Sequence, residues 1–278
     1  MTIHPLQIIL GFTLALLISL IAWRAQMLSA GGGAAATLLG MVVFGFGGFG
    51  WAVLLVAFFI SSSLLSRFYK GSKSSLNDKF SKGSRRDAGQ VLANGFIPGI
   101  FSLLNLFYPA HPFLWMGFVG SLAAVNADTW ATELGVLGRQ TPRLITSWKP
   151  VEKGESGGVT WLGTLAALGG ALFIAAAAAA IGLKIFEDQS FPTPALAVAC
   201  IAFAGFSGSI IDSFLGAALQ ASYFCPACIK HTEHFPLHTC GNPTSLVSGQ
   251  PWLNNDGVNI ICAAAGASLS ILSWLLLI

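Results

Sequence analysis

Charged residues are scarce in this sequence. They make up 9% of its 278 residues, whereas soluble globular domains average about 25%. With a hydrophobic fraction of 54% and a mean hydropathy of +0.73, this scarcity excludes a soluble domain. A membrane-spanning helix needs roughly 20 apolar residues, so the chain has room for about seven or eight spans and no separate soluble domain. We therefore predict an all-α, polytopic transmembrane helix bundle in which residues 1–278 form a single integral membrane domain.

The N-terminus lacks the basic segment and the cleavage site that mark a secretory signal peptide. The apolar run that begins there is therefore predicted to remain as the first span. We see no internal repeat of the kind that builds the inverted halves of many transporters. The net charge of +3 reflects membrane topology and does not indicate a nucleic-acid partner.

Apolar stretches separated by polar or Gly/Pro-rich breaks predict eight spans. Glycine clusters within 25–66 leave open whether that region holds two short helices or one long tilted helix, so seven spans is the alternative. The predicted spans are 6–23, 32–47, 50–66, 89–108, 112–134, 158–182, 194–220 and 255–278.

The basic residues predict the topology of these spans. Most of the 14 Lys and Arg residues fall in 67–88 and 136–157. Loops rich in Lys and Arg remain cytoplasmic. With eight spans, these two loops and 221–254 are predicted to be cytoplasmic, whereas 183–193 and both termini are predicted to lie outside.

Two acidic residues, Asp128 and Glu133, lie within an apolar segment. An ionisable group at the centre of a membrane helix costs at least ~2.5 kcal/mol and is a functional candidate; the alternative is that both acids lie at the membrane interface. Five residues at 100° each place them about 140° apart around a helix, so they should face different partners. Asn126 and Thr129 share the stripe of Glu133.

Two further acids follow in later spans. Asp212 shares a helical stripe with Gly205, Ser209 and Gly216, a small-residue face that would let another helix approach the carboxylate closely. The alternative is that Asp212 has a purely structural role and forms a hydrogen bond to a neighbouring residue. Asp256 follows two asparagines at the start of the last span, where Asn and Asp also serve as ordinary helix caps.

Oxygen ligands from several helices, without His or thiolate beside them, suit Mg²⁺ and hence phosphoryl-group chemistry. Arg85 and Arg86 precede the segment 90–95, and Lys149 precedes the glycine-rich segment 154–160. A glycine-rich loop leading into a helix offers backbone N–H groups to an anion, and Arg can bind phosphate in a bidentate manner. The alternative is that these basic residues only fix the orientation in the membrane.

The segment 221–254 carries a separate signal. Cys225, Cys228, His238 and Cys240 have the ligand types and a CxxC spacing that suit a tetrahedral Zn²⁺ site, and His234 is an alternative to His238. A cytoplasmic location favours a metal over a disulfide. Reduced cysteines without metal, or a disulfide or redox pair, are the other interpretations. A bound Zn²⁺ would be structural and would hold this loop over the site.

These segments resemble the phytyl-phosphate kinase / transmembrane protein 19 family of polytopic membrane proteins. The most specific is 127–135, with the sequence ADTWATELG. Five pieces match, and they follow the order found in the family. The first is Arg86 together with 90–95, the second is 127–135, the third is 157–160, the fourth is 212–216 together with Gln220, and the fifth is 255–259.

The resemblance implies a kinase that converts an isoprenyl monophosphate, such as phytyl or geranylgeranyl phosphate, to the diphosphate with ATP or CTP. In plants and cyanobacteria this reaction salvages phytol for tocopherol biosynthesis. The expected location is the plasma or inner membrane, or a thylakoid or plastid membrane if the source is photosynthetic. The expected partners are the lipid phosphate, the nucleotide and the bilayer. The acceptor phosphate is already ionised, so the reaction needs no strong general base.

The candidate catalytic residues are the four acids, of which Asp128, Glu133 and Asp212 are expected to hold Mg²⁺ and Asp256 completes the set. Two other functions remain open: a cation- or proton-coupled transporter or lipid flippase, and a CTP-dependent cytidylyltransferase. The candidate substrate-binding and phosphate-binding residues are Arg85, Arg86, Asn94, Asn126, Thr129, Lys149, Gly157, Gly158, Thr160 and Asn259.

Overall fold

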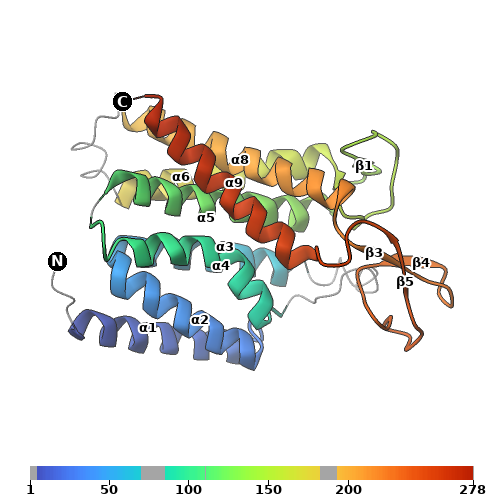
Figure 1. Cartoon of the computed structure of the whole chain (residues 1–278), viewed down its shortest axis with the longest axis horizontal. Coiled ribbons are helices and arrows are strands. Elements are labelled where there is room, and N and C mark those ends of the chain that lie inside the picture. The colour runs from blue at the N-terminus through green and yellow to red at the C-terminus, as the bar shows by residue number, and fades with distance from the viewer. Residues whose placement is uncertain (1–4, 70–84, 110, 182–192, 278) are drawn as a thin grey trace.

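The computed structural model describes residues 5–69, 85–109, 111–181 and 193–277. The basic residues between 70 and 84, and 183–192 of the predicted outer loop, lie outside the described residues. Helices run back and forth along the long axis of the molecule (Figure 1). They are α1 (Pro5–Arg24), α2 (Ala30–Val42) with a π-helical extension (Val43–Gly47), α3 (Phe49–Phe68), α4 (Ala88–Leu104), α5 (Pro112–Gly135), α6 (Trp161–Ile181), α8 (Pro194–Ala218) and α9 (Asn255–Leu275).

The predicted helical membrane bundle is confirmed. Six segments (α1, α2 with its extension, α3, α6, α8 and α9) are long and apolar enough to cross a membrane, whereas α4 is a shorter apolar helix. Two helices, not one, occupy the region 25–66. The chain breaks at Gly48, whose φ of 89° is readily adopted only by glycine.

Helix α5 forms the centre of the bundle, because every residue from Leu114 to Ala127 is buried. It packs against α3, α4, α6, α8 and α9. Small residues allow this close contact. A Cβ atom added at Gly205 of α8 would lie 2.7 Å from the Cβ atom of Ala123. The stripe that carries Asp212 therefore packs directly on α5.

Two of the loops predicted to be cytoplasmic, 136–157 and 221–254, lie at one end of the bundle, which we call the loop end (Figure 1). Short strands form there, which the sequence pattern did not predict: β1 (Arg143–Leu144) pairs with β2 (Gly158–Val159), and a second sheet has the order β4-β3-β5. Because β2 occupies the start of the predicted span 158–182, α6 begins only at Trp161. The three strands of the second sheet are β3 (Ser222–Cys225), β4 (Lys230–Thr232) and β5 (Ser245–Ser248).

Candidate functional site

A cavity of about 130 Å³, here called the acidic cavity, lies at the loop end between α5, α6 and α8. Asp128 of α5 and Asp212 of α8 line it, and their carboxyl groups lie close enough to interact with each other. The Oδ2 atom of Asp212 is shielded from solvent and has no hydrogen-bond partner among the described residues. Two carboxylates that interact in this way repel each other unless a proton or a cation lies between them. The pair is therefore a candidate site for a divalent cation.

The glycine-rich segment predicted to bind phosphate forms one wall of the acidic cavity. Gly157, Gly158 and Thr160 all line it. Gly157 has a φ of 77°, and a Cβ atom there would lie 2.4 Å from the Cβ atom of Ala217, so only glycine lets this loop lie against α8. Thr160 Oγ1 accepts a hydrogen bond of 3.0 Å from the backbone N–H of Gly163. The first turn of α6 thus starts at the cavity, where the positive end of the helix dipole favours an anion.

The cavity also contains Glu233, a residue that the sequence pattern did not single out. Glu233 Oε1 accepts hydrogen bonds from Ser156 Oγ at 2.9 Å and from Gln220 Nε2 at 2.8 Å. It lies close enough to Asp212 to interact with it electrostatically. Its one sequence signal is that it is the only acidic residue of 221–254, the loop expected to lie over the site.

Glu133 faces the opposite side of α5. Its Oε1 atom accepts a hydrogen bond of 2.8 Å from Ser66 Oγ of α3, and it interacts electrostatically with Arg86. Asp128 and Glu133 therefore have different partners, as their helical phase requires. The predicted Mg²⁺ set of Asp128, Glu133 and Asp212 is not assembled in one place, because Glu133 is not among the described residues that line the acidic cavity.

Arg86 is held in place by its own backbone and is 9% exposed. Its carbonyl accepts a hydrogen bond of 2.9 Å from the N–H of Ser29, and its N–H donates to Met27 O at 3.0 Å. The guanidinium lies over the Phe58 ring, 5.4 Å from its centroid. Burial lowers the pKa of Arg86 to about 10, and the carboxylate of Glu133 partly opposes that shift. Arg86 is therefore a cation at neutral pH.

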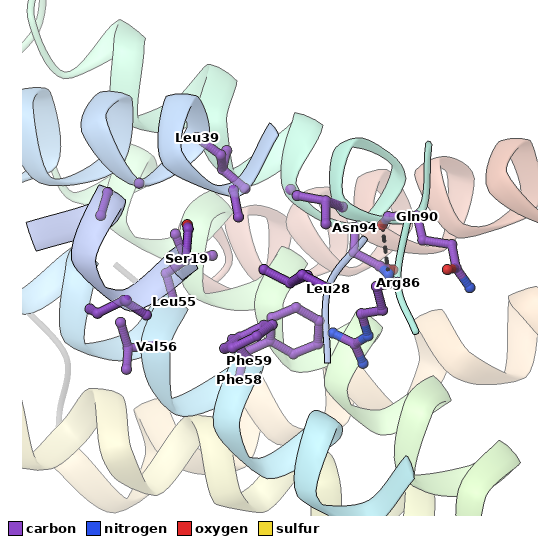
Figure 2. Close-up of a pocket in the computed structure, with 16 residues that line it drawn as sticks. Ser19, Leu28, Leu39, Leu55, Val56, Phe58, Phe59, Arg86, Gln90 and Asn94 are labelled. Atoms are coloured by element: carbon purple, nitrogen blue, oxygen red, sulfur yellow. Dashed lines mark hydrogen bonds between the residues drawn. The ribbon is translucent and has the colours of Figure 1, made fainter. Parts of the chain in front are cut away.

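Arg86 lines a second cavity of about 80 Å³, here called the apolar cavity, between α1, α2, α3 and α4. Figure 2 shows Leu39, Phe58 and Phe59 on its apolar walls and Arg86 at one end. Gln90 and Asn94 lie on the same side as Arg86, and Asn94 Nδ2 donates to Gln90 O at 3.1 Å. The arrangement combines an apolar chamber with a cation at its edge. Arg86 and Asn94 therefore belong to a different cavity from Asp128 and Asp212.

Two predicted phosphate ligands have hydrogen-bond partners within the helix bundle. Ser61 Oγ of α3 donates to Asn126 Oδ1 at 3.0 Å, and Asn126 Nδ2 donates to Gly170 O of α6 at 2.8 Å. Thr129 Oγ1 donates to Val125 O within α5. These bonds occupy both ends of the buried Asn126 amide and tie α5 to its neighbours, so the role of Asn126 in phosphate binding stays a prediction.

The remaining predicted residues are dispersed. Arg85 Nε donates to a backbone carbonyl of the α1–α2 turn at 2.8 Å, and Lys149 is exposed beside the β1–β2 pair. Asp256 lies in the first turn of α9, next to Asn255, which lines the acidic cavity. Asn259 is buried one turn further on. The geometry therefore favours Asp128, Asp212 and the glycine loop over Arg85, Lys149 and Asn259.

The Cys/His cluster predicted from the sequence forms in the structure. The ligand atoms of Cys225, Cys228, His238 and Cys240 all lie within 4.8 Å of one another, an arrangement that could hold a metal ion. Cys225 Sγ and Cys240 Sγ are 3.6 Å apart, and His238 Nδ1 is 3.2 Å from Cys240 Sγ. The structure thus selects His238, not His234, as the histidine of the cluster.

Comparison with known proteins identifies relatives of the chain. A family model described as integral membrane protein DUF92 matches residues 13–267. Protein PGR of Arabidopsis thaliana is 32% identical in an alignment 279 positions long that covers 92% of each chain. An uncharacterized membrane protein of Methanocaldococcus jannaschii is 32% identical over 77% of this chain and 84% of its own. The chloroplastic protein VTE6 of Arabidopsis thaliana is 27% identical over 88% of this chain and 65% of its own. No solved structure matches the chain.

Proposed function

We propose that this chain, which belongs to the DUF92 family of integral membrane proteins, is an isoprenyl-phosphate kinase. Its motifs resemble those of the phytyl-phosphate kinase / transmembrane protein 19 group of that family. The observation that carries this proposal is the facing pair Asp128 and Asp212 in a cavity walled by a glycine-rich loop and the start of α6. Carboxylates next to the N-terminus of a helix suit a metal–nucleotide complex.

Asp128 and Asp212 would hold Mg²⁺. The fit rests on their facing carboxyl groups and on the buried, unpartnered Oδ2 atom of Asp212, since Mg²⁺ usually takes one or two carboxylates and completes its shell with water and phosphate. When bound, Mg²⁺ would neutralise charge on the triphosphate and on the phosphoryl group in transfer.

In the proposed reaction, a phosphate oxygen of the lipid attacks the terminal phosphorus of the nucleoside triphosphate. The bond from that phosphorus to its bridging oxygen breaks, and the nucleoside diphosphate leaves. The attacking oxygen is already ionised, so no residue has to remove a proton from it. The backbone of Gly157 and Gly158 would orient the triphosphate, because positioning supplies much of the catalysis in phosphoryl transfer.

The apolar cavity would hold the isoprenoid chain, and Arg86 at its edge would bind the lipid phosphate. This placement is supported by the apolar walls and the buried cation (Figure 2). Helix α5 carries Asp128 toward the acidic cavity and Glu133 toward Arg86 within five residues. The two proposed binding sites would therefore lie on different faces of the last turns of α5.

Filling the apolar cavity should select against long substrates. Ala36→Phe places an aromatic ring in a chamber that Ala36 lines, so KM for geranylgeranyl phosphate should rise about 10-fold, within the range known for apolar pockets. Turnover of the five-carbon dimethylallyl phosphate should change less than about twofold. Leu38→Phe is the matched control, because Leu38 is 58% exposed on the same helix. Equal effects of both variants on both substrates would show that the isoprenoid chain does not bind in the apolar cavity.

The test of the function itself uses purified protein in detergent or liposomes with phytyl, geranylgeranyl and farnesyl phosphates, Mg²⁺, and ATP or CTP. The expected products are the nucleoside diphosphate and the lipid diphosphate. Release of pyrophosphate would identify a cytidylyltransferase. Ion-gradient-dependent flux without nucleotide consumption would identify a transporter or flippase.

Two smaller proposals accompany this function. Zn²⁺ is the proposed metal of the Cys/His cluster, because three thiolates and one imidazole form a common structural zinc set. The loop end is proposed to face the cytoplasm, because the basic loop 136–157 lies there.

A further inference from the structure

We infer that the Cys/His cluster is a metal-dependent clasp that holds Glu233 in the acidic cavity, where it supplies a further carboxylate to the cation site. The inference extends the proposed function, since it assigns a residue and a second metal to the same site. It starts from chain connectivity. Glu233 directly follows β4 and lies between two members of the cluster, Cys228 and His238.

A metal bound to the cluster would close the segment 229–237 into a loop with both ends fixed. Without that closure, the segment is held by a sheet whose strands are only three or four residues long, and every residue of β5 is exposed. Such a small sheet buries too little apolar surface to be stable by itself. Fixing both ends of a loop also lowers the number of conformations open to its centre.

The cluster has dimensions suited to zinc. A tetrahedral site with Zn–S bonds of about 2.3 Å has S···S edges of roughly 3.8 Å. The Cys225 and Cys240 sulfur atoms are 3.6 Å apart, whereas a disulfide has an S–S bond of about 2.05 Å. His238 is buried and turns Nδ1 toward Cys240. The donor set is thus arranged around one point, as a structural metal site requires.

Glu233 is tied to both walls of the acidic cavity. One carboxylate oxygen accepts from Ser156 in the glycine-rich loop and from Gln220 just beyond α8. Gln220 is buried and also donates to Ser156 Oγ at 3.1 Å. Glu233 thereby lies within electrostatic range of Asp212. A carboxylate added near the pair raises the negative potential and hence the affinity for a divalent cation.

The first measurement is metal content. Full-length protein purified without chelators should contain one zinc per chain, and Cys228→Ser with His238→Ala should lose it. Cys200→Ser is the matched control, because Cys200 lies within α8, away from the cluster ligands, and it should retain zinc. Hydrogen exchange should then rise in 154–158 and 230–234 of the zinc-free protein, because Glu233 no longer holds Ser156.

The second measurement is cation binding, with Mn²⁺ as the probe and electron paramagnetic resonance as the readout, so that it does not depend on turnover. Glu233→Gln should keep its zinc and weaken Mn²⁺ binding about 10-fold, and zinc removal by chelation should do the same until zinc is restored. Glu152→Gln, which changes an exposed carboxylate of the neighbouring loop, should bind Mn²⁺ as the unaltered protein does.

Zinc-free protein with unchanged exchange at 154–158, or Glu233→Gln with unchanged Mn²⁺ affinity, would overturn the inference. A protein that lacks nucleotide turnover, yet passes both measurements, would contradict the kinase assignment and leave the clasp intact.

Discussion

Replacing Asp128 by asparagine should reduce formation of lipid diphosphate by about 1000-fold or more. Asparagine keeps the size of the side chain but removes the charge that faces Asp212 in the acidic cavity. If the pair holds Mg²⁺, the remaining single carboxylate binds the metal–nucleotide complex weakly and in the wrong position. The loss should appear in kcat at saturating nucleotide, measured as nucleoside diphosphate released per chain.

The fold should survive this substitution, because it removes repulsion between two partly buried carboxylates. Without Mg²⁺, the melting temperature of Asp128→Asn should equal or exceed that of the unaltered protein. With Mg²⁺ and nucleotide, only the unaltered protein should gain further stability, since only it binds them tightly. Asp212→Asn should behave alike, and the double variant should lose little more than either single variant, because the two residues act as a unit. Near-normal turnover of Asp128→Asn would refute the assignment.

The helices could be predicted from the sequence because each apolar run must satisfy its backbone hydrogen bonds internally in a bilayer. The break near Gly48 and the starts of α5 and α8 at Pro112 and Pro194 follow from local residue chemistry. The short strands at the loop end could not be predicted in this way. They contain two to four residues each, too few for a periodic pattern.

The site could be predicted only in part, for a similar physical reason. Helical phase separates Asp128 from Glu133, but it does not identify the helix that each one faces. That depends on packing, which turns Asp128 toward α8 and Glu133 toward Ser66 of α3. Glu233 reaches the cavity only because its loop folds back on Ser156, 77 residues away. No local pattern encodes a contact of that range.

Replacing Arg86 by methionine should raise KM for the lipid phosphate about 100-fold while KM for the nucleotide changes less than about threefold. Truncating one member of a buried charge pair typically costs 2–5 kcal/mol, and about 2.8 kcal/mol corresponds to a 100-fold change. Methionine preserves the apolar contact with the Phe58 ring. The substitution therefore removes the positive charge at the edge of the apolar cavity. Arg86→Lys should recover only part of it, because lysine cannot bind phosphate in a bidentate manner.

Arg85→Met is the control that makes this result interpretable. The two arginines are neighbours in sequence, but Arg85 is exposed and donates to a backbone carbonyl, whereas Arg86 is buried beside Glu133 and the apolar cavity. If basic residues here only fix membrane orientation, the two variants should have equal and small effects. If Arg86 binds the lipid phosphate, its variant alone should change KM for that substrate. Equal KM values for the two variants would remove Arg86 from the substrate site and leave the acidic cavity as the only supported part of it.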